Sequence, residues 1–332
     1  MSDTQAPDNR GAAGAITLKQ IRAATKAGDP LLLRSVAARA QAGDADARVV
    51  ILGAQCWAAF SAPGAITPVF DALSAGWLGR EPAAAPAAQS DSAAVAVPDA
   101  LWEAVEELLA DAEQGFDAGT ITARVAALGG LTAPEFGELA EAAARQHPGA
   151  AEPLLQAVPE MIRLESIADA PAGSLASALH RMLVDNGYDA EVLDRDAIGL
   201  TALPPALRFL NTRILQMHDV WHLAAGYETT ALHEIAISAF QLAQFGHNYS
   251  AMFLAVVGLI SGIRTPEGFP LLQQTVYEAW SHGRSTPPLM DVAWEDCWRE
   301  PLEQIREEQG IEPFRGSFPA DLLEQLAATP AA

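Results

Sequence analysis

In the stretch Met217-His218-Asp219-Val220-Trp221-His222-Leu223, two histidines stand four residues apart, and Glu234 follows after eleven further residues. On an α-helix, positions four residues apart differ by about 40° around the axis, so both imidazoles project from one face. Asp219 lies about 100° from His218 and about 60° from His222, at the edge of the same arc. The spacing therefore predicts that this helix offers two nitrogens and a carboxylate to one cation.

A second helix is predicted to return the chain to these histidines. Gly226 interrupts the helical pattern, and Thr229 or Thr230 is a suitable N-cap for a helix that begins near Ala231. Glu234 would then lie in the first turn of that helix. An antiparallel return across the short turn would bring its carboxylate toward the two imidazoles, which gives two nitrogens and two oxygens around one ion.

We assign His218, Asp219, His222 and Glu234 as the metal ligands and as the catalytic residues. Mixed imidazole and carboxylate ligands suit zinc, iron, manganese or cobalt better than calcium, and zinc is our first choice. Three or four protein ligands leave a position for water or substrate. The alternative is that these histidines are ordinary core or surface residues, but five of the seven histidines in the chain fall between residues 218 and 282.

The motif resembles the signature of the coenzyme Q (ubiquinone) biosynthesis protein 4 family, in which a His-Asp-x-x-His stretch precedes a glutamate by eleven residues. The likeness extends beyond the motif and covers roughly residues 100 to 312. The further matching segments are Val125-Ala126-Ala127-Leu128-Gly129, Gly173-Ser174-Leu175, Asp185-Asn186-Gly187, Trp280-x-x-Gly283-Arg284, Pro288-Leu289, Trp294-Glu295-x-x-Trp298-x-x-Pro301-Leu302 and Arg306.

This resemblance implies a metal-dependent enzyme of ubiquinone biosynthesis. The implied reaction is an oxidative decarboxylation, of lyase or oxidoreductase type, in which a prenylated hydroxybenzoate loses its carboxylate and gains a hydroxyl at C1. The implied partners are the polyprenylated aromatic precursor, other ubiquinone biosynthesis enzymes and a membrane surface, and we expect a homodimer. Two alternatives stay open: a non-enzymatic scaffold that presents lipid intermediates, and a metallohydrolase. The second is disfavoured because Asp219 stands where H-E-x-x-H enzymes carry glutamate.

The helix predicted after Glu234 is followed by an uncharged stretch, Tyr249 to Ile263. Roughly 15 residues are fewer than the about 20 that a bilayer span needs. The stretch is therefore predicted to be a central helix of the core. Alternatively, its residues Met252, Phe253 and Val256 line an apolar channel that receives a polyprenyl tail. On the helix before it, Ser238 and Gln241 lie near the Glu234 face.

The composition is that of a globular protein: 332 residues with 50% hydrophobic content. The formal charge of −22 argues against nucleic acid as a partner. Cys56 and Cys297 are the only cysteines, which indicates a reducing compartment without a disulfide framework. Residues 1–14 have neither the apolar core of a secretory signal nor the arginines of a transit peptide. We expect a cytoplasmic protein associated peripherally with the inner membrane.

Composition also suggests how the chain is divided. The predicted segments are a disordered tail (1–16), an N-terminal helical region of unknown role (17–81), an Ala/Pro-rich linker (82–99), the metal-binding helical domain (100–312) and a C-terminal tail (313–332). In the second segment, Gly28-Asp29-Pro30 separates two short helices, and the apolar run Val49 to Phe60 predicts a buried helix.

The remaining patterns are helical as well. The spacing of Leu101, Val105 and Leu108 predicts an amphipathic helix, and Thr132-x-x-Glu135 predicts a capping-box start for another. A further helix over residues 175–183 would end at Asp185-Asn186-Gly187. No alternating strand pattern of useful length occurs, so we expect an all-α fold with a bundle-like core and an additional helical N-terminal region.

Several polar and aromatic residues have less specific predictions. His233 projects away from Glu234 and is expected to support the site or face solvent, and His247 is expected to cap backbone carbonyls. Arg284 is expected to form a surface ion pair. The aromatic residues of the closing segment, Trp294 and Trp298, are expected to lie in the core.

Overall fold

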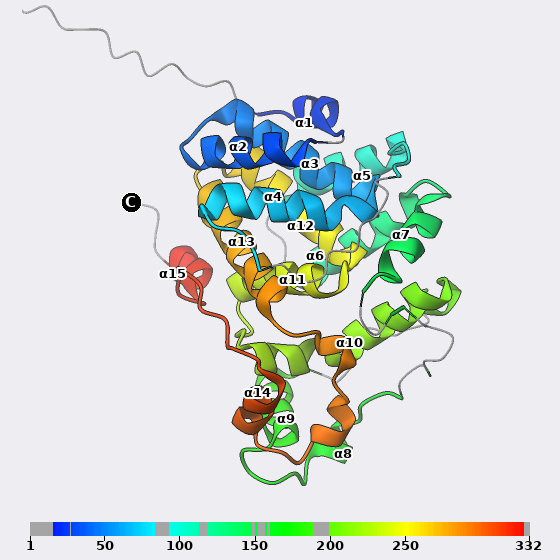
Figure 1. Cartoon of the computed structure of the whole chain (residues 1–332), viewed down its shortest axis with the longest axis vertical. Coiled ribbons are helices and arrows are strands. Elements are labelled where there is room, and N and C mark those ends of the chain that lie inside the picture. Colours follow the sequence, from blue (N-terminus) through cyan, green and yellow to red (C-terminus); the bar gives the residue numbers. More distant parts are fainter. Residues whose placement is uncertain are drawn as a thin grey trace, which may run out of the picture.

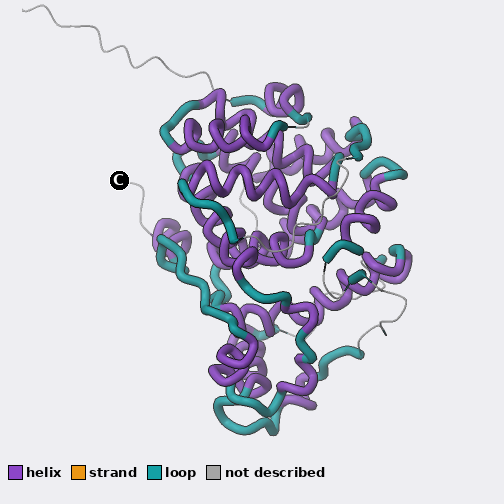
Figure 2. The backbone as a smooth tube through the Cα atoms, viewed as in Figure 1, coloured by secondary structure: helices purple, strands orange, loops and turns teal. Residues whose placement is uncertain are grey.

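Helices and the turns between them make up the parts of the chain that the computed structural model describes: residues 16–26, 28–83, 93–112, 118–147, 150–151, 157, 160–188 and 199–328. Figure 2 shows these ranges as helices joined by loops, without a strand. The β-type pairing among them is an isolated bridge between Ser174 and Pro301. The predicted all-α fold is confirmed.

The helices differ widely in length, and the longest lie in the second half of the chain. In order they are α1 (Leu18–Ala24), α2 (Pro30–Gln41), α3 (Ala45–Phe60), α4 (Ile66–Leu78), α5 (Asp99–Asp111), α6 (Ala118–Leu128), α7 (Phe136–Ala144), α8 (Leu164–Ile167), α9 (Leu175–Asn186), α10 (Pro205–Ala225), α11 (Ala231–Phe245), α12 (Asn248–Arg264), α13 (Phe269–Ser285), α14 (Leu302–Gln309) and α15 (Leu322–Ala328). Figure 1 shows α1–α4 gathered at one end of the molecule and α8, α9 and α14 at the other.

The N-terminal helices begin where local sequence predicts. The Asp29 side chain accepts a hydrogen bond from the backbone N–H of Leu31, and Pro30 occupies the first helical position, where its missing N–H costs nothing. Thr17 and Gln20 form a reciprocal capping box at the start of α1. The two short helices expected around the Gly-Asp-Pro break are therefore confirmed, as is the buried helix that follows them.

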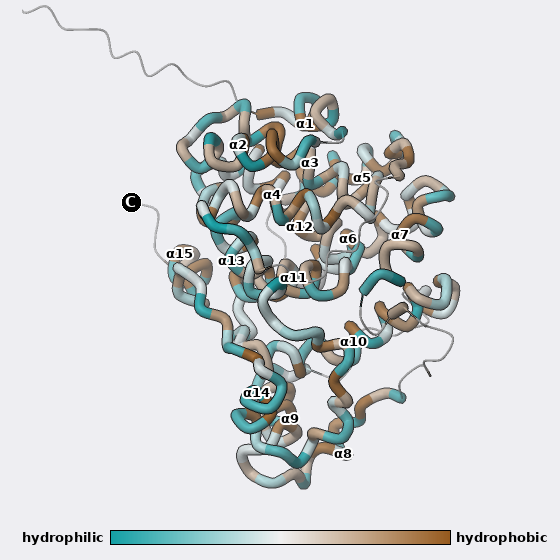
Figure 3. Tube along the Cα trace, in the orientation of Figure 1, coloured by the Kyte–Doolittle hydropathy of each residue, from teal (hydrophilic) through white to brown (hydrophobic). Residues whose placement is uncertain are grey.

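The uncharged stretch lies within α12, a central helix that packs against α3, α5, α6, α11 and α13. Gly262 lets α3 approach closely, because a Cβ at that position would lie 2.5 Å from Cδ1 of Leu52. Figure 3 shows hydrophobic and hydrophilic residues alternating along the helices, as expected when each helix buries one face. The expectation of a central core helix is confirmed.

The N-terminal helices meet the C-terminal part of the chain through buried polar contacts as well as apolar packing. The indole nitrogen of Trp280 donates to Oδ1 of Asp71 at 2.9 Å, and Arg284 donates to both oxygens of the same carboxylate at 3.1 and 3.2 Å. Arg284 is only 7% exposed, so the prediction of a surface ion pair is wrong. Arg284 is buried because α4 covers α13. These helices are far apart in the sequence, so local patterns did not predict the burial.

The division into separate domains stays a prediction. Apolar residues of α1–α4 share one continuous hydrophobic cluster with α5 and with α9 to α14. The predicted linker lies in part outside the described residues, which omit 84–92, and its far end is tied to the helical body: the N–H of Val95 donates to the carbonyl of Ser61 at 3.0 Å. The predicted disordered tail lies outside the described residues up to residue 15.

One predicted helix start is wrong. The helix expected from a capping box at Thr132 begins instead at Phe136, with Glu135 at its N-cap position and no side-chain cap. The hydroxyl of Thr132 donates to the carbonyl of Gly129 at 3.0 Å. The preceding short 3-10 turn places that carbonyl close to the Thr132 hydroxyl. The hydroxyl therefore bonds within the turn and does not cap the helix.

The turn between α10 and α11 is held by the C-terminal part of the chain. Gly226 ends α10 with φ +76, and a Cβ there would lie 2.7 Å from Cβ of Pro313. The backbone N–H of Phe314 donates to the carbonyl of Ala225 at 2.8 Å, and Arg306 donates to that of Ala224 at 3.0 Å. These bonds satisfy carbonyls that the helix end leaves open and fix the direction in which the chain leaves α10.

Candidate metal centre

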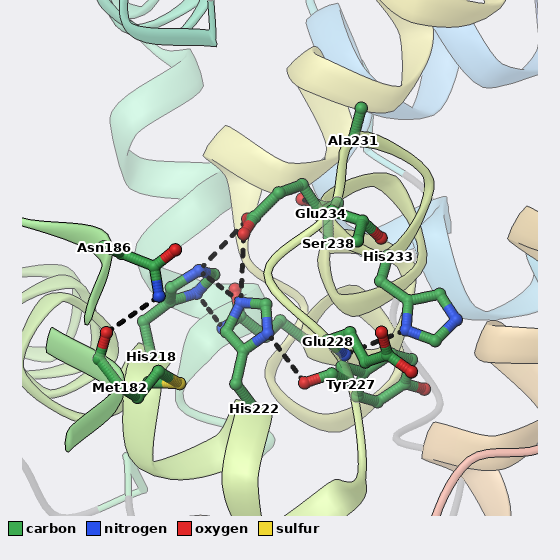
Figure 4. A network of polar contacts seen from close by, with 12 residues as sticks. Met182, Asn186, His218, His222, Tyr227, Glu228, Ala231, His233, Glu234 and Ser238 are labelled. Carbon is green, nitrogen blue, oxygen red and sulfur yellow. Dashed lines mark hydrogen bonds and ion pairs between the residues drawn. The ribbon is translucent and has the colours of Figure 1, made fainter. Parts of the chain in front are cut away.

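Two imidazoles and a glutamate meet where α10 ends and α11 begins. His218 and His222 project from the last two turns of α10, and Glu234 lies in the first turn of α11. The Nε2 atoms of the two histidines are 3.0 Å apart. Each lies 3.4 Å from one carboxylate oxygen of Glu234, so three side chains surround one point, as Figure 4 shows.

Asp219 adds a second carboxylate at the edge of this group. One ligand atom from each of His218, Asp219 and His222 lies within 4.8 Å of the other two, a grouping that could hold a metal ion. The structure thus brings the four side chains named from the sequence to the end of one helix and the start of the next. Their roles as ligands and catalytic residues stay predictions.

The spacing of the donor atoms fits a small divalent ion. A tetrahedral ion with ligands at about 2.0–2.1 Å separates those ligands from each other by about 3.3–3.4 Å. The three distances among His218, His222 and Glu234 are 3.0, 3.4 and 3.4 Å. Imidazole nitrogen with carboxylate oxygen is a donor set that zinc, iron, manganese and cobalt accept. The residues present therefore fit such an ion without rearrangement of the helices.

Charge and burial differ among the candidate ligands. Burial raises the pKa of Glu234, but its contacts with the imidazoles of His218 and His222 outweigh burial and hold that pKa well below its usual range. Burial lowers the pKa of His218, yet the neighbouring carboxylate of Glu234 outweighs it and raises the pKa overall. The side chain of His222 is fully buried, whereas 31% of His218 and 40% of Glu234 are exposed. One side of the group is closed and the other is accessible.

Each imidazole has a separate partner at its other nitrogen. Nδ1 of His222 donates to the carbonyl oxygen of Tyr227 at 3.2 Å, and Nδ1 of His218 lies 2.8 Å from the amide nitrogen of Gln241. Such contacts orient metal-binding histidines. Gln241 lies on the Glu234 face of α11, as its spacing suggested. The backbone contact of Tyr227 left no signal in the sequence, because any residue could supply the carbonyl.

Two other histidines lie outside this group. Nδ1 of His233 accepts the backbone N–H of Glu228 at 2.9 Å, and the residue is 8% exposed, so it supports the turn and does not face solvent. His247 does not cap carbonyls as expected. It contacts side chains, Asn211 at 2.9 Å and Ser250 at 3.0 Å, and burial lowers its pKa to about 3.

The lipid-channel candidates Met252, Phe253 and Val256 are 4%, 9% and 0% exposed, within α12. They lie in the packed core, and a channel along them stays a prediction. In the closing segment, Trp294 is buried as expected and donates to the carbonyl of Leu289 at 3.0 Å. Trp298 is only partly buried and lines a cavity of about 440 Å³ together with Gln216 and Glu295.

Fold and site together define an all-α protein with a histidine and carboxylate group that could hold a metal ion. No helix within the described ranges has the length and apolar character needed to cross a bilayer. The family model of coenzyme Q (ubiquinone) biosynthesis protein Coq4 matches residues 118–315, which is more than half of the sequence and includes all four candidate ligands. The chain belongs to the Coq4 family.

Individual relatives are similar over shorter stretches. The mitochondrial ubiquinone biosynthesis protein COQ4 homolog of Mus musculus is 28% identical over 110 residues, 32% of this chain and 40% of its own length. The Drosophila ananassae homolog is 29% identical over 151 residues, 45% of this chain and 53% of its own. The matches to these curated relatives therefore span about half of their length or less.

A solved structure shares the fold. A crystal structure of a Nostoc punctiforme protein named for ubiquinone biosynthesis superposes with a TM-score of 0.50 at 24% identity, and covers 64% of this chain and 98% of the other. At this identity the likeness concerns the fold alone. Since almost all of that protein is matched by about two thirds of this one, the present chain carries substantial helical structure in addition.

Proposed function

We propose that this protein is a metal-dependent oxidative decarboxylase of ubiquinone biosynthesis, acting at C1 of a prenylated hydroxybenzoate. The observation that supports the proposal most directly is the convergence of His218, His222 and Glu234, with Asp219 beside them, in a protein of the Coq4 family. The same observation supports zinc as the first metal to test, with iron, manganese and cobalt as alternatives.

The proposed reaction replaces a ring carboxylate by hydroxyl. The carboxyl group leaves as CO2 and the ring carbon gains a hydroxyl whose oxygen comes from water. The two electrons released reduce O2 to H2O2, so Ar–COOH, O2 and H2O give Ar–OH, CO2 and H2O2. A divalent ion held by the four ligands would supply a Lewis acid for the carboxylate of the substrate. His222, fully buried and tied to the backbone, would fix the position of the centre, while Glu234 and His218 border its accessible side.

The partners follow from the proposed substrate. A polyprenyl tail partitions into lipid, so we propose peripheral contact with the inner membrane and with other enzymes of the pathway. The uncharged part of α12 (residues 249–263), with Met252, Phe253 and Val256, is the proposed wall for the tail. A homodimer remains part of this proposal.

The test uses purified protein stripped of metal and reloaded with zinc, iron, manganese or cobalt. It is supplied with O2 and a prenylated 4-hydroxybenzoate in detergent micelles, and the C1-hydroxylated product and CO2 are measured. We expect product with a loaded protein and none with the His222→Ala variant. Full turnover by metal-free protein would refute the metal-dependent reaction. No product under any loading, with the lipid retained by the protein, would favour the scaffold function.

A further inference from the structure

The hydrogen bonds around the two histidines form a chain with a defined direction. A backbone carbonyl can only accept, so Nδ1 of His222 must carry the hydrogen that it shares with Tyr227. In the neutral ring, Nε2 of His222 is then an acceptor. It lies 3.0 Å from Nε2 of His218, which must therefore be the donor in that bond.

The same reasoning reaches Gln241. If Nε2 of neutral His218 carries the hydrogen, its Nδ1 has only a lone pair and needs a donor. The amide nitrogen of Gln241, 2.8 Å away, is that donor. Gln241 is 3% exposed, so this contact is shielded from water. Without a metal, the three side chains are thus consistently hydrogen bonded, with donors running from Gln241 through His218 to His222.

A metal ion would require a different arrangement at His218 alone. Coordination by Nε2 needs the lone pair of that atom, so the remaining hydrogen of the ring must be on Nδ1. An N–H on Nδ1 cannot bond to the amide NH2 of Gln241, but it can bond to the amide oxygen. His222 needs no such change, because its Nδ1 already donates to a carbonyl.

We propose that Gln241 is a positioning residue that selects the metal-binding tautomer of His218 by turning over its amide, NH2 toward Nδ1 without metal and carbonyl oxygen toward Nδ1 with metal. A glutamine suits this role because the oxygen and the NH2 group of its amide have nearly the same shape, but the oxygen accepts hydrogen bonds and the NH2 group donates them. This inference rests on the metal-binding part of the proposed function and is independent of the reaction.

The test compares zinc affinities, measured by competition with a chromophoric chelator, for wild type, Gln241→Glu and Gln241→Leu. Glutamate can only accept in its ionised form, so Gln241→Glu should bind zinc at least as tightly as wild type. Gln241→Leu offers no acceptor and should bind about 10–100-fold more weakly, the usual effect of losing such a partner. Gln55→Leu, which replaces a glutamine equally buried on α3, is the matched control and should leave affinity unchanged.

A second measurement needs no variant. Nitrogen-15 shifts of His218 in the wild-type protein should report hydrogen on Nε2 without metal and on Nδ1 with zinc. Equal weakening by Gln241→Glu and Gln241→Leu would overturn the proposal and indicate a packing role, as would hydrogen on Nδ1 in both states. A wild-type protein that binds no zinc or cobalt would overturn the metal centre itself, whereas normal binding without turnover would overturn only the proposed reaction.

Discussion

Polar side chains are matched with one another in different ways in two regions of this molecule. Where α4 covers α13, the carboxylate of Asp71 accepts hydrogen bonds from Trp280 and Arg284, so the acceptor is matched with donors. At the end of α10, two imidazole Nε2 atoms and the oxygens of Glu234 face a common point, so groups with lone pairs converge. The first arrangement is complete without a ligand. The second also offers nitrogen and oxygen atoms that a cation could bind, which is why we propose a function there.

The largest effect is expected at the buried ligand. His222→Ala removes one of the four proposed ligands, and structural zinc sites in general gain about 10–16 kcal/mol from the ion, or about 3–4 kcal/mol per ligand. Zinc affinity should therefore fall about 100–1,000-fold, as measured by chelator competition. His180→Ala, which changes a histidine of α9 that is not a member of this group, is the control. Equal zinc binding by His222→Ala and wild type would remove the contrast between the two regions.

A second variant tests the contact between α4 and α13, where Asp71 accepts hydrogen bonds from Arg284. Asp71→Ala removes the carboxylate that the buried guanidinium of Arg284 contacts, and breaking a buried pair costs about 3–5 kcal/mol. Because 29% of the Asp71 side chain is exposed, we expect a smaller loss of about 2–3 kcal/mol in the free energy of unfolding, measured by urea denaturation. Zinc affinity should not change.

The control for that variant is Glu303→Ala, which breaks the pair with Arg306 at a carboxylate that is 81% exposed. Its loss should stay below about 1 kcal/mol, because exposed ion pairs contribute little. If Asp71→Ala were as mild as this control, the half-buried carboxylate would not be holding α4 to α13.

The smallest effect is expected at the edge of the metal centre. Asp219→Asn keeps an oxygen but removes its charge, and we expect zinc to bind about tenfold more weakly, about 1.4 kcal/mol. Glu228→Gln alters an exposed carboxylate in the adjoining turn and should leave affinity unchanged. A loss for Asp219→Asn as large as that for His222→Ala would show that the accessible side contributes as much as the buried one.

Local sequence predicted most of the helices because their signals are short in range. Asp29 and Pro30 start α2, and Gly187 and Gly226 end α9 and α10 with positive φ. The predictions failed where a neighbour competed for the same group, as at Thr132. At the start of α11, Thr230 stands at the N-cap as expected, but its hydroxyl donates to the carbonyl of Ala320 and does not cap the helix.

The sequence by itself determined that His218 and His222 share a helix face and that Glu234 begins the next helix, because helical periodicity and a glycine break act within a few residues. Only the tertiary structure decided what those side chains touch. The amide of Gln241, the carbonyl of Tyr227 and the pairing of Asp71 with Arg284 all depend on how helices meet. Such contacts join residues that no local rule relates, so they follow from packing and not from spacing.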